Sequence, residues 1–63
     1  MWTKNETTNY STAIKFYDLA LREDPDNLGT LIDKGVTLQN MGKLKLAIRC
    51  FDRVLDVSPE NID

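Results

Sequence analysis

Few side chains in this sequence could do chemistry, and none has the partner that a catalytic role requires. The 63 residues contain no histidine, which is the commonest general base and metal ligand in proteins. The single cysteine, Cys50, falls inside a predicted helix, and no base is available to activate it. We therefore interpret Cys50 as a small buried apolar residue and expect no enzymatic activity.

The carboxylates are numerous, but their spacing does not indicate a metal or acid–base site. Asp52 and Asp56 are four residues apart, so a helix would place them on one face, where they could share a cation. A solvated helix face is the better interpretation of this pair. The sequence also lacks a phosphate-binding glycine loop, zinc-ligand spacing and a calcium loop. We expect neither a cofactor nor a metal.

The charge balance limits the classes of partner. Eight basic and ten acidic residues are interspersed, whereas a nucleic-acid binder usually presents a cationic face to the phosphates. A local patch of Lys43, Lys45 and Arg49 comes nearest to such a face. No apolar run is long enough to span a membrane, and residues 1–9 lack the apolar core of a signal peptide. With one cysteine and no export signal, we expect a cytoplasmic location.

An internal repeat organises the chain. When the sequence is shifted by 34 residues, residues 10–28 align with residues 44–62, with six identities and five conservative matches in nineteen pairs. The two prolines, Pro25 and Pro59, are in register. A fixed period of this length is the signature of stacked-repeat architectures. Such a short chain needs efficient helix packing, more chain or a partner, because apolar burial barely offsets ordering entropy at this size.

Apolar periodicity predicts three helices, at residues 10–24 and 28–41 and from residue 43 or 44 to residue 57. In each, apolar residues recur at i, i+3, i+4 and i+7, the pattern of one buried face. Residues 1–9 are polar and show no such pattern. We expect this segment to be frayed, unless Trp2 folds back over exposed helix.

The ends of these helices carry recognisable signals. Proline ends the first and third helices, because the residue before a proline is pushed out of the α region. Either Thr8 or Asn9 is expected to cap the first helix, and Asn27 to cap the second. Gly42 is well placed as the left-handed residue that ends the second helix.

These features resemble the tetratricopeptide repeat, a 34-residue unit of two antiparallel helices. In the first helix of a unit the family has a large apolar residue, then a small one, then an aromatic or large apolar one, as in Leu31, Gly35 and Leu38. A glycine turn follows, and the second helix carries alanine, an aromatic, alanine and a closing proline. Lys34 and Lys43 depart from the pattern, which usually has leucine and an Asp or Asn cap there.

The resemblance implies an all-α fold, an antiparallel helical hairpin repeat of three helices that forms a piece of an α-solenoid. Residues 1–9 are then a polar N-terminal segment, 10–27 the second helix of a first repeat, 28–61 one full repeat, and 62–63 the start of a further repeat or a tail. The positions implied to pack one helix on another are Ala13, Tyr17, Ala20, Pro25, Leu31, Gly35, Leu38, Gly42, Ala47, Phe51, Val54 and Pro59.

The resemblance also implies a non-catalytic scaffold that binds a protein or peptide in a groove lined by the middle helix. The implied partner-binding residues are Ile32, Asp33, Val36, Gln39 and Asn40, with Gly29 at the rim. Ile32 and Val36 fit peripheral core equally well. Because Asp33 and two aliphatic residues do not suit a carboxylate ligand, we expect an apolar or weakly basic peptide.

Two alternatives remain open. The chain could self-associate as a homo-oligomer, or complete its stack with a longer chain, through uncovered helix faces that include Leu46, Ile48, Cys50 and Leu55. A small helical DNA-binding domain would have to use Arg49 and Arg53, which acidic residues flank. We favour neither nucleic acid nor a membrane as partner, and the sequence does not identify the protein partner.

Overall fold

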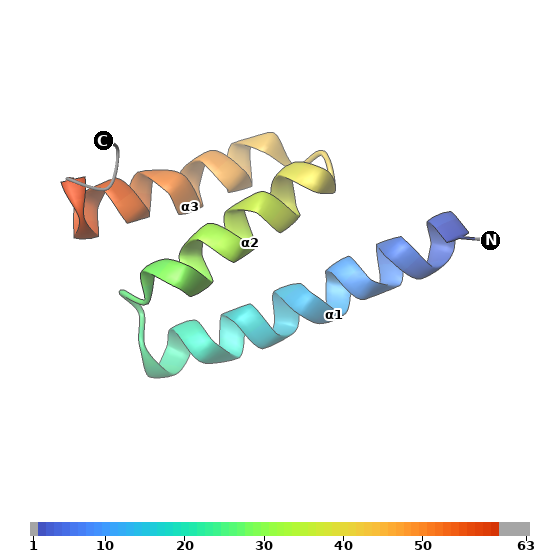
Figure 1. Cartoon of the computed structure of the whole chain (residues 1–63), viewed down its shortest axis with the longest axis horizontal. Coiled ribbons are helices and arrows are strands. Elements are labelled where there is room, and N and C mark those ends of the chain that lie inside the picture. The colour runs from blue at the N-terminus through green and yellow to red at the C-terminus, as the bar shows by residue number, and fades with distance from the viewer. Residues whose placement is uncertain (1, 60–63) are drawn as a thin grey trace.

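The chain folds into three helices joined by short turns. A computed structural model describes the backbone of residues 2–59 and the side chains of residues 10–59. The helices are α1 (Trp2–Glu23), α2 (Leu28–Asn40) and α3 (Leu44–Val57) (Figure 1). This confirms the all-α fold of three helices. Within the described part of the chain, no helix is long and apolar enough to cross a membrane.

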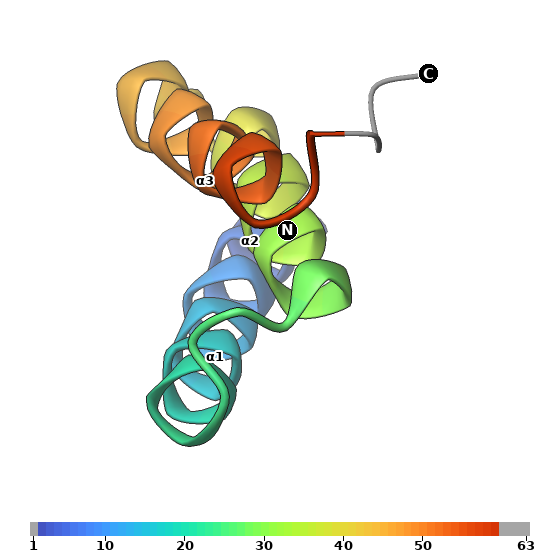
Figure 2. The same ribbon diagram turned by 90° about the vertical axis from the view of Figure 1, so that its left-hand side faces the viewer.

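Helix α2 occupies the centre of the arrangement. It packs against α1 on one side and α3 on the other, and Figure 2 shows it between them in an end-on view. The contact between α2 and α3 is more extensive than that between α1 and α2. Helices α2 and α3 thus form the hairpin, and α1 precedes it as an extra helix.

Helix α1 begins earlier than the sequence pattern predicts. It starts at Trp2, so Thr8 and Asn9 lie inside the helix, and the prediction that one of them caps its start is wrong. Residues 2–9 contain no proline or glycine, and a formed helix extends by adding one hydrogen bond for each further residue. The side chain of Trp2 lies outside the described residues, so its folding back stays a prediction.

Asn27 caps α2, as predicted. The Thr30 N–H donates a hydrogen bond of 2.9 Å to the Asn27 side-chain oxygen, which satisfies one of the backbone donors that every helix leaves unpaired at its start. Pro25 lies in the turn that follows the last residue of α1. The turn and the cap together allow α2 to begin only a few residues after α1 ends.

Gly42 ends α2 in the left-handed conformation, also as predicted. Its φ angle is +81°, which only glycine adopts at little cost. The Gly42 N–H donates to the Gln39 carbonyl and the Lys43 N–H donates to the Leu38 carbonyl, the two bonds of a Schellman motif. Lys43 makes no side-chain hydrogen bond as the cap of α3, in keeping with its departure from the family pattern.

The core lies between α2 and α3. Its buried apolar side chains are Leu31, Leu38, Ala47, Cys50 and Val54. Gly35 is buried beside them, and a Cβ atom built on it would lie only 2.6 Å from the Cε1 atom of Phe51. The absence of a side chain at Gly35 therefore allows the Phe51 ring to sit directly against the backbone of α2.

The other positions implied to pack between helices differ in burial. Ala13, Tyr17 and Phe51 are partly buried, whereas Ala20, Pro25, Gly42 and Pro59 are exposed. The prolines and Gly42 lie at or beside helix ends, where exposure is ordinary. Ala20 is different, because it lies within α1 and corresponds to the buried Val54 of α3. No described residue covers its face of α1.

Two glycine substitutions should have opposite effects on stability. Gly35→Ala should lower the free energy of unfolding by about 1–3 kcal/mol, because the new methyl group would overlap the Phe51 ring. Gly29→Ala is the matched control, since its methyl group would meet only the Asn27 oxygen at 3.5 Å. That variant should gain up to about 1 kcal/mol from helix propensity.

Urea unfolding followed by circular dichroism measures both changes. If Gly35→Ala were as stabilising as Gly29→Ala, the close packing of Phe51 on α2 would be contradicted.

Candidate functional site

The described residues show no constellation suited to catalysis. No group of three or more Cys, Asp or Glu side chains within this part of the chain could hold a metal ion. Cys50 is a free, buried cysteine in the core. Burial raises the pKa of its thiol above the ordinary value of 9.0, the Lys34 ammonium opposes this rise, and the Asp18 carboxylate adds to it. The neutral thiol is a poor nucleophile, so Cys50 acts as an apolar core residue.

The five implied partner-binding residues share one face of α2. Successive residues of a helix are rotated by about 100°, which places these five on the side opposite Lys34 and Leu38. Asp33, Gln39 and Asn40 are exposed, and Val36 is exposed at 44%. Ile32 is partly buried at the edge of the core. The α2 outer face, as we call these five residues, is therefore accessible, and binding of a partner there stays a prediction.

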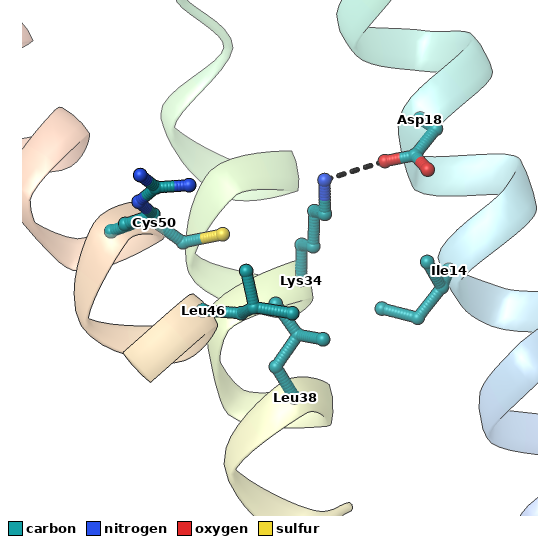
Figure 3. Close-up of a pocket in the computed structure, with 7 residues that line it drawn as sticks. Ile14, Asp18, Lys34, Leu38, Leu46 and Cys50 are labelled. Carbon is teal, nitrogen blue, oxygen red and sulfur yellow. Dashed lines mark ion pairs between the residues drawn. The ribbon is translucent and has the colours of Figure 1, made fainter. Parts of the chain in front are cut away.

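An ion pair joins α2 to α1 on the opposite side. The Lys34 ammonium lies 2.6 Å from the Asp18 carboxylate, and the Lys34 side chain is 24% exposed (Figure 3). Lys34 occupies a position where the tetratricopeptide repeat usually has leucine. The aliphatic part of its side chain can still cover apolar surface while its charge reaches the carboxylate at the helix edge.

A groove between α1 and α3 adjoins this ion pair. One hollow of about 350 Å³ is lined by Ile14 and Asp18 of α1, Lys34 and Leu38 of α2, and Leu46, Arg49 and Cys50 of α3 (Figure 3). A second, of about 330 Å³, is lined by Ser11, Ile14, Lys15, Leu38, Met41, Lys43 and Leu46. Because both hollows share Ile14, Leu38 and Leu46, we treat them as one feature, the α1–α3 groove.

The sequence alone did not predict this groove. Its lining comes from three helices, and apolar periodicity does not reveal how far apart two helices lie when a third one separates them. One feature of the sequence did point to this region: Lys34 departs from the family pattern. A charged residue at a position that is usually apolar requires a nearby partner or solvent.

The outer flanks of α1 and α3 expose large apolar side chains. Phe16 is exposed at 65% and Leu19 at 54% on α1, and α3 exposes Leu44 at 57% and Ile48 at 56%. Leu46, also exposed, belongs to the α1–α3 groove. Each of these pairs lies three or four residues apart on its own helix, and exposed apolar patches often mark interaction surfaces.

The two arginines that a DNA-binding domain would need have different surroundings in the fold. Arg53 donates to the Asp26 carboxylate at 2.8 Å, an exposed pair that ties α3 to the turn between α1 and α2. Arg49 lines the α1–α3 groove. Asp52 and Asp56 are both exposed beside them. These contacts give the DNA-binding alternative no additional support.

Cys50 should react slowly with thiol reagents in the folded chain. Because its pKa is raised and the residue is largely buried, little thiolate is present or accessible at pH 8. Labelling with dithiobis(nitrobenzoate) should be much slower in buffer than in urea. Equal rates in the two conditions would contradict the buried position of the thiol.

The raised pKa also has a consequence for stability. A group whose pKa is higher in the folded than in the unfolded state stabilises the fold fully below its unfolded pKa and loses this contribution as pH rises through its folded pKa. The contribution of Cys50 should therefore be complete at pH 7 and decrease above about pH 9. Urea unfolding at both pH values, compared with Cys50→Ala, measures it.

Comparison with known proteins identifies one family. The model of the tetratricopeptide repeat matches residues 28–61, a stretch that includes α2 and α3. Neither the curated proteins nor the solved structures contain a significant match to the chain.

Proposed function

The chain belongs to the tetratricopeptide repeat family, and on that basis we propose that it is a non-catalytic protein-interaction module. Repeats of this family generally mediate contacts between proteins. The observation that carries the proposal is that each of the three helices exposes large apolar side chains: Phe16, Leu19, Val36, Leu44, Leu46 and Ile48. A cytoplasmic location is part of the proposal, because the lone Cys50 has no partner for an internal disulfide.

The first candidate site is the α2 outer face. Ile32 and Val36 are one helical turn apart and offer a short apolar stripe, and the exposed Gln39 and Asn40 extend it with hydrogen-bonding groups. Asp33 adds one negative charge to this face. A short peptide or partner helix with apolar and basic side chains would match it. Binding should be weak, because one helix face offers much less area than a standard interface.

A basic peptide tests this site. We expect a fluorescein-labelled hexapeptide with two leucines and four lysines to bind the chain in a fluorescence polarisation titration. The double variant Ile32→Lys/Val36→Lys should raise its Kd at least about tenfold, because it removes the apolar stripe and repels the lysines. Helicity should persist, since Val36 is exposed and Ile32 is only partly buried.

The matched control is Phe16→Lys/Leu19→Lys, which also replaces two apolar residues with lysine but on α1. It should change the Kd much less. Equal losses in the two double variants would show that net charge, and not the α2 outer face, controls binding of this peptide.

The second candidate function is completion of the helical stack. The buried residues of α3, namely Ala47, Cys50 and Val54, follow Ala13, Phe16 and Ala20 of α1 by 34 residues. In α3 this face packs against α2, whereas in α1 Phe16 and Ala20 are exposed. A helix that packs on α1 as α2 packs on α3 would bury them. Another copy of the chain, or a longer chain, could supply it.

Self-association should then depend on concentration and on α1. Sedimentation equilibrium up to about 1 mM should show the average mass rising above that of the monomer, since weak contacts form only near their Kd. Phe16→Lys/Leu19→Lys should abolish the rise, and Ile32→Lys/Val36→Lys should not. A strictly monomeric chain across this range would contradict self-association.

A further inference from the structure

The α1–α3 groove concentrates positive charge on a chain whose net charge is −2. Lys15, Lys34, Lys43 and Arg49 line it, which is four of the eight basic residues in the sequence. Asp18 is the one acidic residue among the lining side chains. The positive charge is therefore local, and it surrounds an apolar surface.

Most of this charge has no partner inside the described chain. Asp18 already binds Lys34 at 2.6 Å. Within residues 10–59 the other ion pair joins Arg53 to Asp26, away from the groove. Lys15, Lys43 and Arg49 are exposed, and no described carboxylate forms an ion pair with them. Their ammonium and guanidinium groups are available to carboxylates of another molecule.

Apolar side chains form the centre of the groove. Leu38 and Cys50 are buried beneath it, and Ile14, Met41 and Leu46 are partly or largely exposed around them. Each hollow, at roughly 350 or 330 Å³, is near the lower end of the size range of ligand pockets. This is room for one or two apolar side chains rather than for a large ligand.

The two hollows follow one another along α2. Lys34 lines the first and Met41 the second, and Leu38 lies between them and lines both. Seven residues of helix span about 10 Å, which is the length of about two helical turns or three extended residues. The stretch from Lys34 to Met41 covers both hollows, so their centres lie about half of this span apart, and a ligand that fills both needs two apolar side chains about one helical turn apart.

We propose that the α1–α3 groove binds an acidic segment of a partner protein, which places two apolar side chains in the hollows and its carboxylates beside Lys15, Lys43 and Arg49. This proposal rests on the proposed function of the chain as a protein-interaction module. It adds a second site, which prefers an acidic ligand, whereas the α2 outer face prefers a basic one. The apolar centre favours side chains over phosphates, and the exposed Asp52 and Asp56 on the same helix as Arg49 disfavour a polyanion.

An acidic peptide tests the proposal. The probe is a fluorescein-labelled hexapeptide with two leucines three positions apart and four glutamates. A titration followed by two-dimensional NMR of the labelled chain should show saturable shifts at groove residues such as Ser11, Leu38 and Leu46. The α2 outer face should not respond. Raising NaCl from 0.05 to 0.5 M should weaken binding severalfold, because salt screens exposed charges.

Two charge reversals, two residues apart at the start of α3, provide the matched comparison. Lys43→Glu should raise the Kd of the acidic peptide about tenfold, because Lys43 lines the groove. Lys45→Glu changes the net charge equally, but Lys45 lines neither hollow, so its effect should stay below about twofold. Both lysines are exposed, so neither variant should disturb the fold.

Several results would overturn the proposal: no saturable shifts in the groove, shifts centred on Ile32 and Val36, equal effects of the two reversals, or equal shifts of the groove residues when the basic hexapeptide is added. A DNA duplex that produced the same shifts with the same dependence on Lys43 would also overturn it, in favour of phosphate binding. None of these outcomes affects the test of the α2 outer face, since that test uses a basic peptide and variants on the opposite side of α2.

Discussion

The three helices are arranged around the close approach of α2 and α3 at Gly35. With no side chain at this position, the Phe51 ring packs against the backbone of α2. Leu31 and Leu38, one turn to either side of Gly35, are buried along the same helix. A few residues thus form a buried apolar interface between the two helices of the hairpin. This is important because the chain is too short to enclose a large core.

Because α2 packs against helices on two sides, its remaining surfaces face in different directions and have different chemistry. The α2 outer face carries Ile32, Val36 and the negative charge of Asp33. On the other side, Lys34 and Leu38 contribute to a groove with a positive rim. The two proposed sites therefore lie on opposite sides of α2 and differ in charge, so ligands of opposite charge would not compete for one site and the charge of a ligand would indicate where it binds.

The features that sequence predicts well are those that depend on local interactions. The cap at Asn27 is a hydrogen bond to a residue three positions away, and the end at Gly42 depends on the φ angle of a single glycine. The start of α1 was not predictable in this way, because residues 2–9 carry no apolar stripe, yet no residue among them stops a helix. Ala20 shows a different limit: it occupies a core position of the repeat, and its burial depends on a helix that the described chain does not supply.

The two candidate sites show the same contrast between features set by local interactions and features set by the packing of distant segments. Helical periodicity alone placed Ile32 and Val36 on one face of α2, but the α1–α3 groove required the positions of three helices and the direction in which Lys34 reaches Asp18. The 34-residue repeat relates α1 to α3 and so indicates which face of α1 is left uncovered. It does not report the distance between these two helices, and that distance determines the width of the groove.

Helices α2 and α3 form the stable unit, and α1 is held more weakly, with one face uncovered. Hydrogen exchange of backbone amides, followed by NMR, tests this difference most directly, because protection reports the free energy of local opening. We expect the slowest exchange at Leu38, Ala47 and Cys50, and clearly faster exchange at Phe16 and Leu19. Protection in α1 as strong as that in α3 would contradict it.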